Sequence, residues 1–449
     1  MRGFGNIIAA MTMATKQGFV RNGKVRMKPR LTLHQEPRRV VVTGMGIIAP
    51  GAIGKEQLWN FLFHGRSTIA TLSRFDPGTL PCTVGGEVIG FDPLDYMGRK
   101  TSHRIDRAAQ FALGAARMAW QDAELDSGLK EQSNVGVFEG TSLGPLVSTL
   151  ESHKTYLQSG CHRANPTLLM SSMMGGGSGF IALELGVHGP SITVADGSVS
   201  SAYAIGYGYR CIKSGGVDIA IVGGAEAPLS EEVLATFSCA RLLSTDNSAP
   251  CEAMKPFDRY RDGFVLGEGG AFLILEESGH AIRRNARAYG EIIGFGETTD
   301  AYHPTSPDPE GAWAVRAMEN ALAEGNILPH EVQYLNAHGT ATKANDIVET
   351  RAIRRVFREH PERLSISSTK PFTGHLLGAC GALEAVTTLL AMTHSFVPPT
   401  LNLSSPDEGC DMDYVPRAGR NKHIRFAMSN NYSFGGRNSS LLFARFLDV

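Results

Sequence analysis

What this 449-residue sequence lacks excludes several common classes of protein. Its 7 cysteines are scattered, with no C-x-x-C pair and no Cys/His spacing typical of zinc ligands. We therefore expect no metal site, no disulfide framework and a reducing, cytoplasmic location. The 43 basic and 44 acidic residues leave a formal net charge of -1. Charge of that size gives no overall attraction to nucleic acid, so a nucleic-acid partner is not expected.

Long hydrophobic runs are also missing. No apolar stretch approaches the ~20 residues that span a bilayer, so we expect no membrane segment. Residues 1–37 form a separate basic leader with one acidic residue, Glu36, and we expect this leader to be disordered. Its apolar patch, Ile7 to Met11, is too short for a secretory signal. Targeting to an organelle is the alternative interpretation of the leader.

Beyond the leader, short apolar strands alternate with helices. A β-branched run at 38–44 ends in glycine, and residues 104–125 carry apolar side chains at helical spacing. Two more buried strands are predicted at 134–138 and 218–224, with a helix of small residues between them at 200–212. Short buried strands between helices favour an α/β fold with a parallel sheet covered on both faces.

The second half of the chain repeats this plan. Five segments correspond, in the same order, to the strands and helices of the first half: 291–296, 314–323, 332–336, 374–394 and 424–428. Two copies of one unit predict a pseudo-twofold fold with a site between the halves. We place the first half at 38–288 and the second at 289–449.

Three strand-to-helix turns carry side chains suited to catalysis, at the edge where open α/β sheets bind ligands. Ser198 opens the first small-residue helix, where free backbone N–H groups favour developing negative charge. His338 follows a predicted strand, and an imidazole can move a proton near neutral pH. Lys370 and His375 converge on the start of the second small-residue helix, which would polarise a pocket for an oxyanion. Helix capping is the simpler alternative for Ser198 and for His338, and an ordinary basic helix start is the alternative for Lys370 with His375.

Two glycine-rich segments complete the set of candidate loops. The run 431–436 is predicted to bring backbone N–H groups close to a ligand. The run 175–179 lacks the Lys-Ser/Thr ending of a phosphate loop, so we interpret it as a flexible turn.

Together the motifs resemble the β-ketoacyl-acyl-carrier-protein synthase II family, the elongating ketosynthases of fatty-acid and polyketide synthesis. The resemblance runs from about Arg38 to Phe446. Its markers, in order, are Val41-Val42-Thr43-Gly44-Met45-Gly46, Pro256-Phe257-Asp258, Arg261-Asp262-Gly263-Phe264, Gly267-Glu268-Gly269, His338-Gly339-Thr340, Lys370 with Gly374-His375, and Phe434-Gly435-Gly436. The resemblance implies an α/β thiolase fold, two βαβαβαββ units in five α-β-α-β-α layers, and a dimer.

The resemblance also assigns roles in the second half of the chain. His338 and His375 resemble the paired active-site histidines, which stabilise the enolate and the thioester oxygen. Lys370 resembles the lysine that orders them, and Glu349 occupies the position of its acidic partner.

Further assignments concern the substrate and the carrier. Thr340 and Thr342 resemble the hydroxyls that hold the pantetheine arm. Phe434 resembles the gating phenylalanine, whose N–H joins that of the nucleophile in the oxyanion hole. Arg99 and Lys100 resemble a basic patch that meets the acidic acyl carrier protein, and a solvated helix start is the alternative for this pair. No bound cofactor is expected, because the phosphopantetheine arrives on the carrier.

The chain departs from the family at the nucleophile. The family pattern is Thr/Ser-Ala-Cys-x-Thr/Ser-Gly, whereas this chain has Asp196-Gly197-Ser198 and Ser201. Because several neighbours differ along with the nucleophile, natural divergence explains the serine better than a single engineered change. An alcohol is far less acidic than a thiol, so Ser198 needs a general base, for which His338 and His375 are the candidates.

Three hypotheses follow from that serine. In the first, Ser198 is acylated from a carrier thioester, and the acyl group passes on by condensation or to another nucleophile. In the second, Ser198 is idle and the histidines with Lys370 decarboxylate malonyl groups for chain priming. In the third, the chain is a non-catalytic chain-length factor paired with a cysteine-bearing ketosynthase. Retention of the histidines and the lysine favours the first two. Homodimer and heterodimer both stay open.

Overall fold

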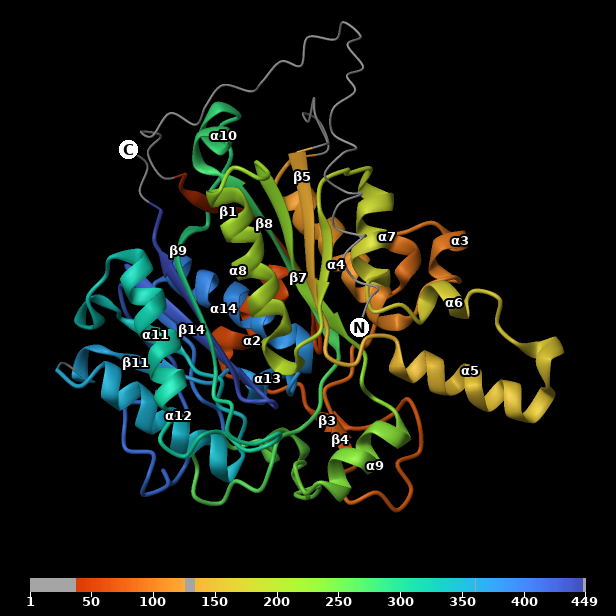
Figure 1. Ribbon diagram of the computed structural model, residues 1–449. Helices are drawn as coiled ribbons and strands as arrows, with labels where there is room; N and C mark the ends of the chain where they lie inside the picture. Colours follow the sequence, from red (N-terminus) through yellow and green to blue (C-terminus); the bar gives the residue numbers. More distant parts are fainter. Residues whose placement is uncertain (1–37, 126–133, 360, 447–449) are drawn as a thin grey trace, which may run out of the picture. The chain divides into compact units, whose positions relative to one another are not determined.

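The computed structural model describes residues 38–125, 134–359 and 361–446, and the basic leader lies outside them. Its main feature is one 11-stranded sheet, built from two sets of five strands with the short β2 added to β1 (Figure 1). The strands of the first half are β1 (Val40–Ala49), β2 (Ala52–Ile53), β5 (Val135–Gly140), β6 (Ser191–Val194), β7 (Ile219–Glu226) and β8 (Gly269–Glu277). Those of the second half are β9 (Gly290–Thr299), β10 (Tyr334–Asn336), β11 (Ser365–Ser367), β14 (Phe426–Ser433) and β15 (Arg437–Ala444).

The strand order confirms the internal repeat. Outward from the middle of the sheet, the first half runs β1-β8-β7-β5-β6 and the second runs β9-β15-β14-β10-β11. The two middle strands join the halves, because Val40–Val42 of β1 pairs antiparallel with Gly290–Ile292 of β9. Each strand predicted in the first half thus has a counterpart at the mirrored place in the second.

The prediction of a parallel sheet is only partly right. β5 runs parallel to β6 and β7, and β10 runs parallel to β11 and β14. β8 and β15, by contrast, are antiparallel to the strands on both of their sides. The connection from β7 to β8 therefore starts and ends at the same end of the sheet, instead of crossing over it as a parallel connection must. The sheet is mixed.

Helices complete the α-β-α-β-α layers of the thiolase fold. α4 (Arg107–Asp122) and α7 (Gly176–Leu185) cover the first half on the outside, and α11 (Ala312–Gly325) and α12 (Lys343–Val356) cover the second (Figure 1). α8 (Ser200–Lys213) and α14 (Cys380–His394) pack against each other in the middle layer. Because the middle layer is enclosed by both halves, α14 is buried all round from Cys380 to Met392.

Paired glycines let the outer helices approach their strands. A Cβ on Gly46 of β1 would lie 2.0 Å from the carbonyl oxygen of Ala115 in α4. A Cβ on Gly296 of β9 would lie 1.8 Å from the carbonyl oxygen of Ala317 in α11. The same close packing at equivalent places is a further sign of the duplication, and it explains the Gly-x-Gly spacing in both strands.

The edge of the sheet next to α7 differs from what the sequence predicts. The flexible turn expected at 175–179 is wrong, because α7 begins at Gly176. A Cβ on Gly177 would lie 2.0 Å from a carboxylate oxygen of Glu139, so glycine serves close packing there.

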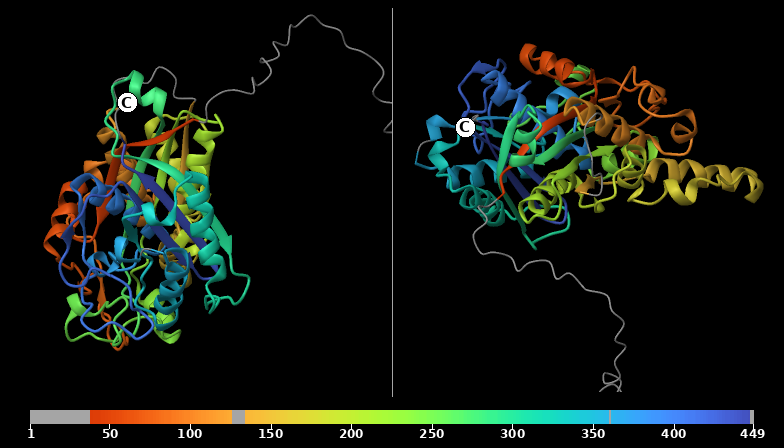
Figure 2. Two further views of the ribbon diagram at one scale, coloured as in Figure 1. Left: turned by 90° about the vertical axis from the view of Figure 1, so that its left-hand side faces the viewer. Right: turned by 90° about the horizontal axis from the view of Figure 1, so that it is seen from above.

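Nearby, α5 (Leu146–Ser159) extends away from the sheet and has no buried residue (Figures 1 and 2). Among the described helices, none is both long and apolar enough to cross a membrane.

Candidate active site

Ser198 lies at the turn that follows strand β6. The chain leaves β6 at Val194, makes the short 3-10 helix η4 (Gly197–Val199) and continues directly into α8. Gly197 has φ +67°, a conformation that a residue with a side chain adopts at a cost, and this places Ser198 at the start of the helix. Its hydroxyl oxygen lies 2.9 Å from Nε2 of His375, which comes from the other half of the chain.

His375 is fixed by the turn that leads into α14. Its backbone N–H donates to the carbonyl oxygen of Val265 at 2.7 Å, and its ring stands edge-on to Phe264. The ring is buried, and Nδ1 has no hydrogen-bond partner among the described residues. The pair of Ser198 and His375 is therefore a dyad, without the carboxylate that orients the imidazole in a catalytic triad.

His338 follows strand β10 and faces the same space. Its ring centroid lies 5.6 Å from that of His375, with the two planes at 84°. Glu349 on α12 accepts hydrogen bonds from the backbone N–H groups of His338 and Gly339, at 2.7 and 2.8 Å. Lys370, in the short helix α13 (Lys370–Thr373), places its Nζ 3.2 Å from Nδ1 of His338. The structure thus brings the predicted hydroxyl, lysine and two imidazoles together.

The acidic partner of Lys370 is Glu384, and the expectation that Glu349 has this role is wrong. Lys370 and Glu384 form an ion pair with both side chains buried, and Asn431 donates to the second carboxylate oxygen. Although burial alone would lower it, the carboxylate of Glu384 raises the pKa of Lys370, so the ammonium stays charged. Glu349 acts instead on the backbone of His338, and burial raises the pKa of Glu349 to about 7.

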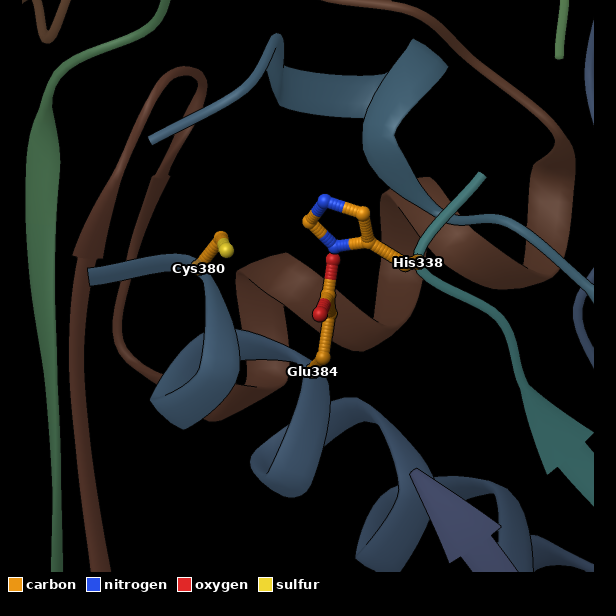
Figure 3. A group of neighbouring side chains, drawn as sticks. All are labelled: His338, Cys380 and Glu384. Atoms are coloured by element: carbon orange, nitrogen blue, oxygen red, sulfur yellow. The ribbon is translucent and has the colours of Figure 1, made fainter. Parts of the chain in front are cut away.

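One cluster near this ion pair has groups that could ligate a metal. The ligand atoms of His338, Cys380 and Glu384 lie within 4.8 Å of one another, and Figure 3 shows Glu384 reaching from α14 toward the His338 ring. The Lys370 ammonium contacts both the ring and the carboxylate. Burial raises the pKa of the Cys380 thiol, which donates to the carbonyl oxygen of Ser198. The Lys370 ammonium therefore already provides a positive charge at this cluster.

Burial also sets the protonation of the two imidazoles. Burial first, and then the charge of Lys370, holds the pKa of both His338 and His375 well below its ordinary value near 6.5. Both rings are neutral at physiological pH. Because Lys370 donates to Nδ1 of His338, the proton of that ring sits on Nε2. His338 is then a hydrogen-bond donor, and His375 is available as a base.

The site opens into a cavity of about 690 Å³. Apart from the serine and the histidines, its walls include Thr340, Thr342 and Phe434. The hydroxyls of Thr340 and Thr342 lie 3.0 Å apart, and Phe434 is 43% exposed. Arg99 and Lys100 stand apart from these residues, exposed at the start of helix α3 (Arg99–Ser102).

Sequence reasoning missed several residues of the site. Glu384 had a signal, since it is the one carboxylate in the otherwise uncharged run from Cys380 to Met392, and a buried acid needs a partner. Ser433 had none. It lies at the end of β14, and its hydroxyl accepts a hydrogen bond from the N–H of Ser198 at 2.9 Å. The ion pair of Asp196 and Arg437 at 2.9 Å was missed as well, because these residues are far apart in sequence.

Fold and site together define a class, the duplicated thiolase-fold proteins whose hydroxyl and imidazoles come from opposite halves. Sequence comparison gives the family within that class. The profile of the "Beta-ketoacyl synthase, N-terminal domain" matches residues 37–281, and that of the "Beta-ketoacyl synthase, C-terminal domain" matches residues 289–404. The chain belongs to the beta-ketoacyl synthase family, and the resemblance seen in its motifs is confirmed.

Individual relatives agree with this assignment. The chain is 40% identical to the 3-oxoacyl-[acyl-carrier-protein] synthase 2 of Coxiella burnetii, over 92% of this chain and 100% of the relative. It is 41% identical to the synthase of the same name from Synechocystis sp., over 92% and 99%. Such relatives place the chain in a family of acyl-transferring enzymes of fatty-acid or polyketide synthesis.

Solved structures show the same fold. A beta-ketoacyl synthase from Burkholderia phymatum has a TM-score of 0.84 at 34% identity, covering 91% of this chain and 100% of that one. The ishigamide ketosynthase/chain length factor has a TM-score of 0.85 at 33% identity, covering 92% and 100%. A type II PKS acyl-carrier protein in complex with its ketosynthase also gives 0.85, at 30% identity and the same coverage.

Proposed function

We propose that this protein is a ketosynthase-like acyltransferase in which Ser198 takes the place of the family's cysteine and accepts an acyl group from an acyl-carrier-protein thioester. The carrying observation is the 2.9 Å contact between Oγ of Ser198 and Nε2 of His375. A neutral imidazole at this distance is within reach to act as the general base that an alcohol needs.

In the proposed reaction, His375 takes the proton of Ser198 as Oγ attacks the thioester carbonyl carbon. The oxyanion that forms is stabilised by the backbone N–H groups of Ser198 and Phe434. The carbon–sulfur bond then breaks, and the carrier thiol leaves with the proton returned by His375. The product is an oxoester on Ser198.

The second half of the reaction passes the acyl group on. In condensation, a malonyl carrier thioester loses carbon dioxide, and its enolate carbon attacks the carbonyl carbon of the Ser198 ester. The bond between that carbon and Oγ then breaks, and Oγ takes a proton from water, which restores the free serine. His338, whose Nε2 carries the proton, donates to the enolate oxygen, and Lys370 holds that tautomer. Transfer to another nucleophile would use the same ester.

Delivery of the acyl group needs no resident cofactor, since the phosphopantetheine belongs to the carrier protein. Thr340 and Thr342 line the cavity on the way to Ser198 and would bind the pantetheine amides. The exposed Arg99 and Lys100 would meet acidic side chains of the carrier, as basic and acidic surfaces attract and orient partners.

A second ketosynthase-type chain is the proposed partner at the free edge of the sheet. β6 is the last strand of the first half, and its Ile192 is 46% exposed. Exposed Leu169, Met170 and Met173 lie between α5 and α7 in the sequence. An exposed edge strand beside apolar side chains is typical of an interface. Mass measurement of the native protein, alone and with a related cysteine-bearing chain, would separate a homodimer from a heterodimer.

Intact mass spectrometry tests the acyl-enzyme directly. After incubation with an acyl-carrier-protein thioester, we expect the protein to gain the mass of one acyl group, and the Ser198→Ala variant to gain none. The reason is that Ser198 is the hydroxyl held against His375. An adduct that persists in Ser198→Ala would place the acyl group elsewhere and contradict the proposal.

Malonyl decarboxylation for chain priming is the second candidate. It is favoured by the retained His338, His375 and Lys370, which polarise a thioester oxygen without any nucleophile. If no adduct forms and the Ser198→Ala variant still releases carbon dioxide from malonyl carrier protein, decarboxylation replaces acyl transfer. A protein that is inert alone, and that copurifies with a cysteine-bearing ketosynthase, would indicate a chain-length factor.

The rate of acylation should hold as the pH falls from 7.5 to 6.0. An imidazole of ordinary pKa loses about three quarters of its neutral form at pH 6.0, whereas the lowered pKa of His375 keeps it neutral there. The same shift means that the unfolded chain takes up protons that the folded chain does not, so stability declines as the pH falls below about 6.5. Initial rates of adduct formation at several pH values test the expected pH profile of acylation, and a fall of about fourfold between pH 7.5 and 6.0 would contradict it.

A further inference from the structure

The position that an oxyanion would use beside Ser198 is already filled by a side chain. The N–H of Ser198 donates to the hydroxyl oxygen of Ser433 at 2.9 Å. In the proposed function, that same N–H receives the carbonyl oxygen of the acyl group. A hydroxyl oxygen at this distance is a full hydrogen-bond acceptor, so it holds the donor that the transition state requires.

Local geometry holds the backbone of Ser433 beside the Ser198 turn. Ser433 ends β14 and is paired in register with Arg437 of β15, and its carbonyl oxygen accepts from the N–H of Gly436 at 3.1 Å. Arg437 in turn contacts Asp196 at 2.9 Å and the carbonyl oxygen of Phe434 at 3.2 Å. The glycine-rich turn is thus held to the Ser198 turn at two points, one through the serines and one through the ion pair.

The residue before Ser198 provides the room. A Cβ on Gly197 would lie 2.1 Å from the hydroxyl oxygen of Ser433, a distance that real Cβ contacts do not reach. Gly197 and Ser433 are therefore compatible with each other in this conformation, whereas alanine at position 197 would displace the Ser433 hydroxyl.

We infer that Ser433 restrains the proposed acyl transfer, because its hydroxyl occupies the oxyanion position in the free protein and must rotate away before Ser198 is acylated. The inference rests on the proposed function. Rotation about the Cα–Cβ bond of a serine is rapid, and it breaks one neutral hydrogen bond. Removing the hydroxyl should accelerate acylation by about three- to tenfold, the worth of such a bond.

The test compares Ser433→Ala with Ser440→Ala and the unchanged protein. Ser440 is a buried serine on the same hairpin, but its hydroxyl donates to Asn430. We expect faster adduct formation from acyl-carrier-protein thioester in Ser433→Ala alone, with a higher maximal rate and an unchanged half-saturating concentration. Slower acylation in Ser433→Ala would overturn the inference, because the hydroxyl would then assist the oxyanion.

Hydrogen exchange at the Ser198 amide gives a readout that does not need acylation. We expect this amide to exchange faster in Ser433→Ala than in Ser440→Ala, because it loses its acceptor. Absence of an adduct in all three proteins would count against the Ser198 acyl-enzyme. The exchange rate would then decide the place of Ser433 by itself, and equal rates in both variants would overturn the inference.

Discussion

Replacing His375 by alanine is expected to lower the rate of Ser198 acylation by about 10²–10⁴-fold, the usual contribution of a general base. The ring nitrogen that contacts the half-buried serine hydroxyl is lost, and with it the nearest acceptor for the hydroxyl proton. Single-turnover acylation, followed by intact mass, measures the effect directly. A loss of less than about threefold would show that His375 is not the base.

His338→Ala is the matched control for this experiment. His338 is buried in the same pocket and its ring faces that of His375, but its hydrogen bonds are to Lys370 and to Glu349, not to Ser198. We expect its loss to leave acylation within about tenfold and to suppress the later condensation instead. Equal losses of acylation in both variants would indicate general damage to the pocket.

Replacing Lys370 by methionine is expected to lower the free energy of unfolding by about 3–5 kcal/mol at neutral pH, because Glu384 is then buried without its partner and has to be held either as an unpaired charge or as a protonated acid. Urea denaturation with a spectroscopic probe measures this change. Without the ammonium, burial raises the pKa of Glu384 further above its ordinary 4.5. The folded variant then holds a proton that the unfolded chain releases, so the deficit should grow as the pH rises above 4.5.

Two further variants separate charge from packing at this ion pair. The double change Lys370→Met with Glu384→Gln removes both charges, and we expect it to recover at least half of the lost stability. Arg316→Met, which breaks the exposed pair with Glu319, should cost less than about 1 kcal/mol. A Lys370→Met variant as stable as the unchanged protein would mean that Glu384 is already neutral in the fold.

Much of the fold could be predicted because the duplicated pattern constrains it twice. The strands predicted at 38–44 and 291–296 have similar apolar patterns, and they form β1 and β9, the two middle strands of the sheet. The direction of β8 could not be foreseen, because a strand has the same alternation whichever way it runs. The turn predicted at 175–179 failed for a related reason. Glycine permits both a bend and close packing, and only the position of Glu139 shows which one applies.

The residues of the site that could be predicted are those whose side chains are suited to few kinds of chemistry. A hydroxyl and two histidines at strand ends point to proton transfer wherever they meet, and Ser198, His338 and His375 do meet. Glu349 and Glu384 show the limit. Both are buried glutamates on helices, and their roles follow from whether Lys370 or a backbone N–H lies opposite. Which partner each glutamate meets depends on how two helices pack, and a single sequence does not specify that packing. Ser433 is a similar case.

The seam between β1 and β9 has a consequence for how such a protein can change over time. A gene for one half alone would encode a hydroxyl without a base, or a base without a hydroxyl. Selection for the proposed activity therefore acts also on the backbone pairing of Val40–Val42 with Gly290–Ile292, which joins the two halves. New specificities can arise by altering the loops around the cavity, whereas the pairing of β1 with β9 has to be kept.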